Sequence, residues 1–146
     1  IDVYMPDIKY GDAQAAELYS HAGDYIEISQ RAAKEMHRQV GNLVLDGHGM
    51  AQRGLLVRHL VLPGNMGGTQ KVLEFVARDI SSQAAVNILP NYRPCNSALG
   101  TPPLNRPISE AEYQEALASA KALGLRQVAI QGSATSDPFC SYDGAA

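Results

Sequence analysis

The sequence lacks the features that mark several large classes of protein. It contains no tryptophan and only two cysteines, Cys95 and Cys140, among its 146 residues. These cysteines lie far apart, and the chain does not open with a charged segment followed by an apolar one. A disulfide framework is therefore not expected, and a reducing cytoplasm is the expected location. No apolar run approaches the roughly 20 residues that a helix needs to span a bilayer.

Charge is also sparse and evenly spread. Lys and Arg number 12 and Asp and Glu number 15, which gives a net charge of −3. A nucleic-acid-binding domain needs a clustered basic face, and binding to an anionic membrane needs a basic run. The sequence has neither, so we expect neither nucleic acid nor a membrane as a partner.

The sequence does contain an alternation of short apolar strands and amphipathic helices. The run from Leu55 to Leu62 is nearly continuous, as in strands that are buried on both faces of a parallel sheet. Shorter strands are predicted at residues 3–8 and 85–89, and helices at 13–20, 25–40, 69–81 and 110–123. This alternation predicts βαβ units. The expected fold class is α/β, the C-terminal portion of a parallel (β/α) partial TIM-type barrel, because three or four such units are about half of an eight-unit barrel.

Local signals predict where some of these elements begin. Ser109 with Glu112, and Asp24 with Glu27, have the spacing of a capping box at the start of a helix. An Asp-Gly pair between apolar residues predicts a hairpin within residues 43–51. Three of the expected elements therefore have a turn or cap signal of their own.

The chain is divided into two parts. Residues 1–125 are expected to form the partial barrel, and residues 126–146 to hold a short strand at 127–131 followed by a loose, small and polar tail. The sequence begins directly in a strand-like pattern and without a methionine. We expect residue 1 to be an internal position of a longer protein.

Charged side chains occur where the predicted strands end. Asp7 and Lys9 lie two residues apart near the end of the first strand, and Arg58 interrupts the second. The C-terminal ends of barrel strands share one rim, and these three groups together would bind an anionic or zwitterionic small molecule. Two other interpretations stay open. Asp7 and Lys9 would simply pair with each other, and Arg58 would meet an acidic side chain rather than a ligand, since a buried guanidinium needs an anion.

Histidines and cysteines show no metal-site pattern. His59 follows Arg58 and therefore points to the opposite face, toward the covering helices, where we expect a structural histidine with a hydrogen bond. The other three histidines have no second ligand at metal spacing, and the cysteines form neither CxxC nor CxxxCxxC. These residues by themselves predict no metal site.

Five segments form a recognisable set. They are YMPDIKYGD at residues 4–12, RGLLVRHLVLPG at 53–64, EMHRQVG at 35–41, NILPNYRP at 87–94 and LNRPI at 104–108. Together they resemble the later half of radical-SAM proteins related to the pyruvate formate-lyase activating enzyme, and the similarity extends over roughly residues 1–125. The first two segments in combination are fairly specific to that subgroup.

The resemblance implies a partial barrel that binds S-adenosylmethionine and a [4Fe–4S] cluster. In that family the cluster receives an electron from a donor and passes it to the sulfonium, and the 5′-deoxyadenosyl radical then abstracts a hydrogen atom from a substrate. In the activating enzymes the substrate is a glycine of a glycyl-radical partner protein. Asp7 matches a position associated with a monovalent cation near the cofactor carboxylate. Lys9 and Arg58 match basic positions of the cofactor and substrate cleft. Tyr92 falls close to the position at which the activating enzyme has a histidine near the cofactor.

The sequence departs from the family in one large respect. The CxxxCxxC loop that holds the cluster is absent, and so is the glycine-rich strand that binds the methionyl amino group. We therefore expect a radical-SAM enzyme only when these residues are part of a longer protein, and no activity from residues 1–146 alone. Two alternatives are a cluster-free barrel enzyme that binds an anionic metabolite and a non-catalytic remnant that acts as a binding module.

Overall fold

A computed structural model describes residues 1–127 and shows an α/β fold with an open, mostly parallel sheet. The strands are β1 (Val3–Tyr4), β2 (Val44–Leu45), β3 (Ala51–Leu60), β4 (Ala85–Leu89) and β5 (Arg126–Gln127). Their order across the sheet is β1-β3-β4-β5, and all three of these pairings are parallel. The short β2 pairs antiparallel with the beginning of β3, which confirms the predicted hairpin.

Helices connect the parallel strands in sequence. The α-helices are α1 (Ala13–Ser20), α2 (Tyr25–Val40), α3 (Thr69–Phe75) and α4 (Glu110–Ala122). Shorter helical segments are η1 (Pro63–Asn65), η2 (Val76–Ile80) and η3 (Asn96–Gly100). Among the described residues, no helix is both long and apolar enough to cross a bilayer. Three strands and four helices were thus predicted in the right order, with α3 and the π-helical η2 together filling the predicted helix 69–81.

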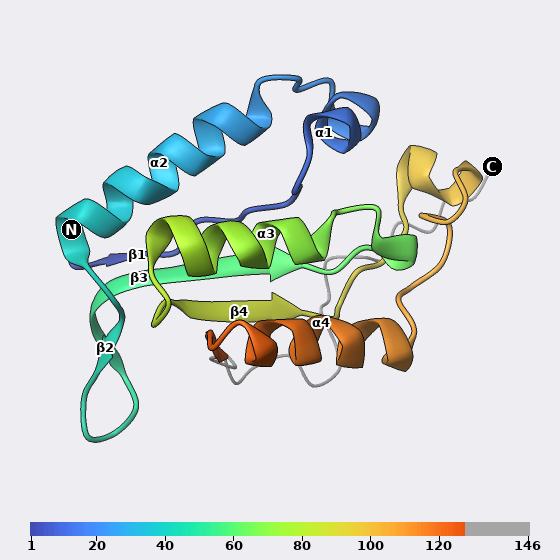
Figure 1. The fold of residues 1–146 in the computed structure, drawn as a ribbon. Helices are drawn as coiled ribbons and strands as arrows, with labels where there is room; N and C mark the ends of the chain where they lie inside the picture. The colour runs from blue at the N-terminus through green and yellow to red at the C-terminus, as the bar shows by residue number, and fades with distance from the viewer. Residues whose placement is uncertain (128–146) are drawn as a thin grey trace.

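The helices α2, α3 and α4 cover one face of the sheet, as Figure 1 shows. They share one core cluster with the strand residues that point toward them. On β3 these are Leu55 and Val57, and on β4 they are Val86 and Ile88. Arg58 comes from an alternate position of β3 and points to the other face. All three predicted covering helices therefore lie on one side of a sheet whose strands follow one another in chain order.

Two local predictions were wrong. The first strand is shorter than residues 3–8, because Pro6 has no N–H to give to the ladder, although pairing resumes as an isolated bridge between Asp7 and Arg58. Asp24 does not cap α2 with its side chain, because its backbone (φ −90°, ψ 1°) already lies near the helical region. The Ser109 and Glu112 capping box is present as predicted.

The last predicted elements lie at the limit of the described part. β5 begins at Arg126 rather than at residue 127, and it pairs parallel with β4. The rest of the predicted strand 127–131 and the predicted tail lie outside the described residues.

Candidate functional site

An ion pair between Asp7 and Arg58 lies on the face of the sheet opposite α2, α3 and α4. Arg58 Nε donates to Asp7 Oδ1 at 2.7 Å, and Nη2 lies 3.4 Å from Oδ2, so the two planar groups face each other. Both side chains are about one-third exposed, at 36% and 37%. Arg58 therefore has an acidic partner within this chain, as one of the two open interpretations of this residue expected.

Lys9 lies beside the same pair. Its Nζ is 3.5 Å from Asp7 Oδ2, so Asp7 lies between two cations. The Tyr25 hydroxyl accepts from the Lys9 backbone N–H at 2.8 Å and donates to the Asp7 carbonyl at 3.3 Å. Burial raises the pKa of the Tyr25 phenol, which keeps this donor protonated. The structure thus brings Asp7, Lys9 and Arg58 together at one place, and α2 fixes the backbone between Asp7 and Lys9 through Tyr25.

Asn87 is a polar neighbour of this cluster that the sequence prediction did not single out. It lies in register with Arg58 on the adjacent strand β4 and is only 4% exposed. The signal that drew attention to Arg58, a polar residue inside an apolar strand, is present at Asn87 as well. Sequence reasoning could therefore have included it.

His59 joins three elements on the helix-covered side, as predicted. It is 1% exposed, and its Nδ1 lies 2.7 Å from the Ile8 carbonyl while Nε2 lies 2.9 Å from Thr69 Oγ1. A carbonyl only accepts, so Nδ1 carries the proton and Nε2 accepts from the Thr69 hydroxyl. Ile8 lies between Asp7 and Lys9, and His59 follows Arg58. The imidazole therefore fixes the two segments that carry the charged cluster.

Protonation of His59 should make the stability of the protein depend on pH. Burial lowers the pKa of this imidazole below its usual value of 6.5, so the native state stays neutral while the unfolded chain takes up a proton. The stabilisation is complete above pH 6.5 and is lost as the pH falls below it, by up to about 1.4 kcal/mol per pH unit. Urea denaturation between pH 5 and 8 would measure this slope.

The control for this prediction is a pair of substitutions. His59→Asn removes the titrating group and should flatten the slope by the contribution of one proton. His48→Asn removes an exposed histidine from the hairpin turn and should leave the slope as in the parent chain. An unchanged slope in His59→Asn would mean that other groups cause the pH dependence.

A cavity of about 700 Å³ lies at the C-terminal ends of the strands, beside the charged cluster. Lys9, Leu60 and Tyr92 line it from the ends of the strands and the segments that follow them. Its other walls come from α1 and from residues 97–104. In Figure 1, α1 and the η3 segment both lie at the arrowhead end of the sheet. Tyr92 thus lines the same cavity as Lys9, whereas Asp7 and Arg58 are not among the lining residues.

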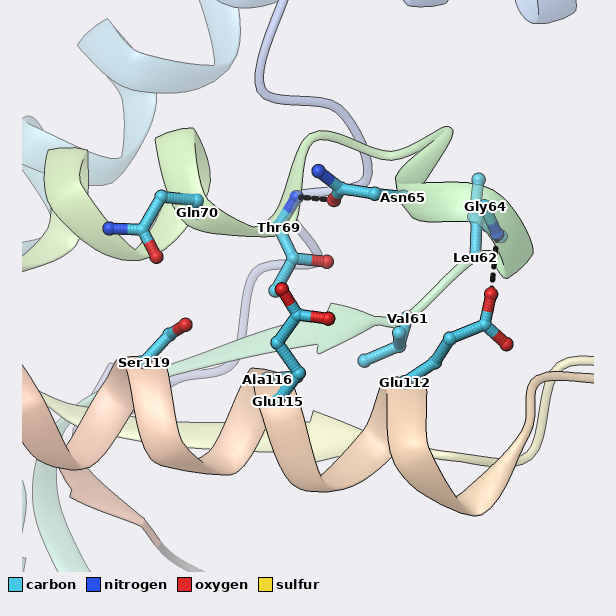
Figure 2. Close-up of a pocket in the computed structure, with 10 residues that line it drawn as sticks. All are labelled: Val61, Leu62, Gly64, Asn65, Thr69, Gln70, Glu112, Glu115, Ala116 and Ser119. Carbon is cyan, nitrogen blue, oxygen red and sulfur yellow. Dashed lines mark hydrogen bonds between the residues drawn. The ribbon is translucent and has the colours of Figure 1, made fainter.

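A second, smaller cavity of about 310 Å³ lies on the helix-covered side, between α3 and α4. Figure 2 shows Glu115 directed from α4 toward Thr69, and Glu112 bonded to the backbone of Gly64. Glu112 also forms two hydrogen bonds with Arg106, and the guanidinium holds the pKa of that carboxyl far below its usual range. This cavity contains none of the predicted site residues, and its carboxylate Glu112 is used to join α4 to the loop after β3.

Metal ligands do not gather in the described part of the chain. Within residues 1–127, no group of three His, Cys, Asp or Glu side chains is arranged to hold a metal ion. Cys95 is exposed at the start of η3, and Cys140 lies outside the described residues.

Comparison with known proteins gives a distant, uncharacterized relative. No protein-family model matches the sequence, and no solved structure matches it significantly. The sequence is 29% identical over 126 residues to an uncharacterized protein of Methanocaldococcus jannaschii. The match covers 86% of this chain and 33% of the archaeal protein, so the chain spans about a third of the length of that relative.

Proposed function

We propose that these residues form the C-terminal part of a radical-SAM enzyme of the activating-enzyme type, in which they hold S-adenosylmethionine and its substrate at the rim of a partial (β/α) barrel. The observation that carries the proposal is the convergence of Asp7, Lys9 and Arg58 on the face of the sheet opposite α2, α3 and α4. These are the three charged residues for which the sequence resemblance implies a place in the cofactor and substrate cleft. The enzyme would work in the cytoplasm with an electron donor and a glycyl-radical partner protein.

The arrangement of the sheet supports the barrel part of the proposal. Strands in chain order with α2, α3 and α4 on one face are the arrangement of consecutive units of a β/α barrel, where helices form only the outer layer. Doubly wound folds instead place helices on both faces. The greater length of the archaeal relative agrees with a protein in which these residues act together with a further segment.

The chain itself does not fit the iron–sulfur cluster. A site of this kind needs three thiolates at CxxxCxxC spacing, and the sequence has two distant cysteines. We therefore assign no electron transfer to these residues. Their proposed work is binding: Arg58 and Lys9 offer cationic donors to a carboxylate, and Asp7 offers oxygen atoms to a monovalent cation beside it.

The lack of a CxxxCxxC motif in these residues favours a second candidate, a cluster-free barrel protein that binds an anionic metabolite at this rim. It would act as an enzyme with another chemistry or as a binding module without catalysis. Binding of S-adenosylmethionine distinguishes the two candidates, because only the first requires it.

Arg58→Ala in the intact protein should weaken binding of S-adenosylmethionine or of the substrate roughly 10- to 100-fold, because one charge-assisted contact is worth about 1.5–3 kcal/mol. Equilibrium dialysis with the labelled cofactor measures the change. Iron content should stay unchanged, since Arg58 ligates no metal in the proposal.

Thermal stability separates this outcome from a structural role. The Asp7–Arg58 pair is one-third exposed, and such pairs contribute only about 0–1 kcal/mol, so the melting temperature should fall by a few degrees at most. Arg78→Ala, at an exposed arginine of η2, is the matched control and should leave binding unchanged. A large loss of stability with unaltered binding would contradict the proposal.

A further inference from the structure

The 700 Å³ cavity beside the charged cluster is walled by aromatic rings. Tyr10, Tyr19 and Tyr92 all line it, and they come from three separate segments of the chain. A volume of this size is within the range of sites that bind small organic molecules, and its place at the C-terminal ends of parallel strands is where α/β folds bind ligands.

The hydroxyls of these three tyrosines are occupied within the protein. Tyr10 Oη lies 2.7 Å from Ser20 Oγ, and Tyr19 Oη donates to the Met66 sulfur at 3.0 Å. Tyr92 Oη donates to the Leu104 carbonyl at 2.8 Å, which joins two residues of the cavity wall that are distant in the sequence. Burial raises the pKa of Tyr92, so the phenol keeps the proton it donates. With their polar ends engaged elsewhere, the tyrosines offer the ligand their rings.

Among residues 1–127, the ionisable groups on the cavity wall other than tyrosine are Lys9 and His21, and no carboxylate of this part of the chain lines it. The Lys9 ammonium lies 3.5 Å from the Asp7 carboxylate, and Lys9 is a lining residue of the cavity whereas Asp7 is not. The Lys9 side chain is 55% exposed and therefore accessible to a ligand. The cavity thus combines aromatic and aliphatic walls with a cationic end.

We propose that this cavity binds an aromatic carboxylate, with its ring against Tyr10, Tyr19 and Tyr92 and its carboxylate at Lys9. Tyrosine rings favour a flat aromatic ligand over a saturated one of equal size, and the ammonium favours an anion over its neutral amide. The inference goes beyond the proposed function and does not require S-adenosylmethionine.

The test uses 2-naphthoate, 2-naphthamide and decahydro-2-naphthoate with the intact protein. Residues 1–146 contain no tryptophan, so naphthyl fluorescence reports binding without an indole background from this part of the protein. Naphthoate should bind about tenfold more tightly than naphthamide, which lacks the charge. It should bind roughly two- to tenfold more tightly than the saturated acid, which is measured by competition.

A variant tests the cation directly. Lys9→Met keeps an unbranched side chain, one atom shorter and without the charge, and should reduce the preference for naphthoate over naphthamide about tenfold, while naphthamide itself binds as before. Lys71→Met, at a lysine of α3 that pairs with Asp12 outside the cavity, should leave both affinities unchanged. A thermal melt checks that both variants fold, and the comparison of the three ligands in the parent protein stands without them.

Three results would overturn the inference: no binding of naphthoate at millimolar concentration, equal affinity for acid and amide, or equal affinity for aromatic and saturated acids. The outcome is separate from that of the proposed function, because these measurements contain no S-adenosylmethionine. If the cofactor fails to bind but naphthoate binds with the expected preferences, the cavity inference stands and the radical-SAM proposal falls. If the cofactor binds but naphthoate does not, the radical-SAM proposal stands and the cavity inference falls.

Discussion

Replacing Gly54 by alanine should destabilise the protein by about 3–5 kcal/mol, which is a large part of the 5–15 kcal/mol typical of a folded domain. Gly54 has a φ of +119°, a region that is nearly closed to residues with a Cβ, and this strain costs about 1–3 kcal/mol. A Cβ at this position would also overlap the Asn42 carbonyl and the Leu43 Cα, and overpacking of this kind adds about 1–3 kcal/mol. Both obstacles are backbone atoms, so no side-chain rotation can relieve them.

Urea denaturation measures the loss, and Gly47→Ala is the matched control. A Cβ on Gly47, in the turn of the same hairpin, meets nothing within 4 Å, so that change should stay within about 1 kcal/mol. If Gly54→Ala is as stable as Gly47→Ala, then β3 does not pass as close to the Asn42 segment as the structure shows.

His59→Ala should be nearly as damaging, with a cost of about 3–5 kcal/mol. It removes a buried ring and leaves the Ile8 carbonyl and the Thr69 hydroxyl without their partner, so a cavity and two unsatisfied polar groups arise together. Because Ile8 is flanked by Asp7 and Lys9, ligand binding at the rim should weaken along with stability. Chemical denaturation at pH 7 measures the first effect.

A double-mutant cycle shows whether the two hydrogen-bonded groups are coupled. Thr69→Val alone removes the hydroxyl that donates to Nε2 and should cost about 1–2 kcal/mol. In the double variant the loss should be smaller than the sum of the single losses, because no hydroxyl is then left unsatisfied. Strict additivity would contradict the proposed bond between His59 and Thr69.

The sheet and its helices were predictable because burial leaves a strong pattern in the sequence. The apolar run around Val57 marked β3, and the Ser109 box marked the start of α4. The lengths of the elements and the exposure of individual side chains were harder to predict. Ile28 has the helical spacing of a buried residue but is 48% exposed, while Ala33 is the residue of α2 that is 1% exposed. A single apolar position does not show how far a helix extends beyond the sheet it covers.

In the candidate site, only those residues could be predicted whose positions follow from the two-residue period of a strand. Asp7, Lys9 and Arg58 followed from two-residue alternation and from the common rim of parallel strands. The tyrosine cavity did not follow, because Tyr10, Tyr19 and Tyr92 are distant in sequence and are brought together by α1 and by a connection without regular periodicity. The same holds for Tyr25, whose hydroxyl reaches the Asp7–Lys9 backbone from another element. Contacts between loops depend on tertiary structure, for which one sequence gives no local signal.

The order of the strands also bears on how the chain is made. Among the described residues, each parallel strand lies beside the one that precedes it in the sequence, so a strand leaving the ribosome meets a neighbour that has already been synthesised. Once β3 has emerged, both β1 and β2 have the strand with which they pair. The helix α3 and the strand β4 can then add to β3 as they appear. Within residues 1–127 the sheet can therefore grow in one direction during translation, and each early strand of this part of the chain can be paired before the later strands β4 and β5 are made.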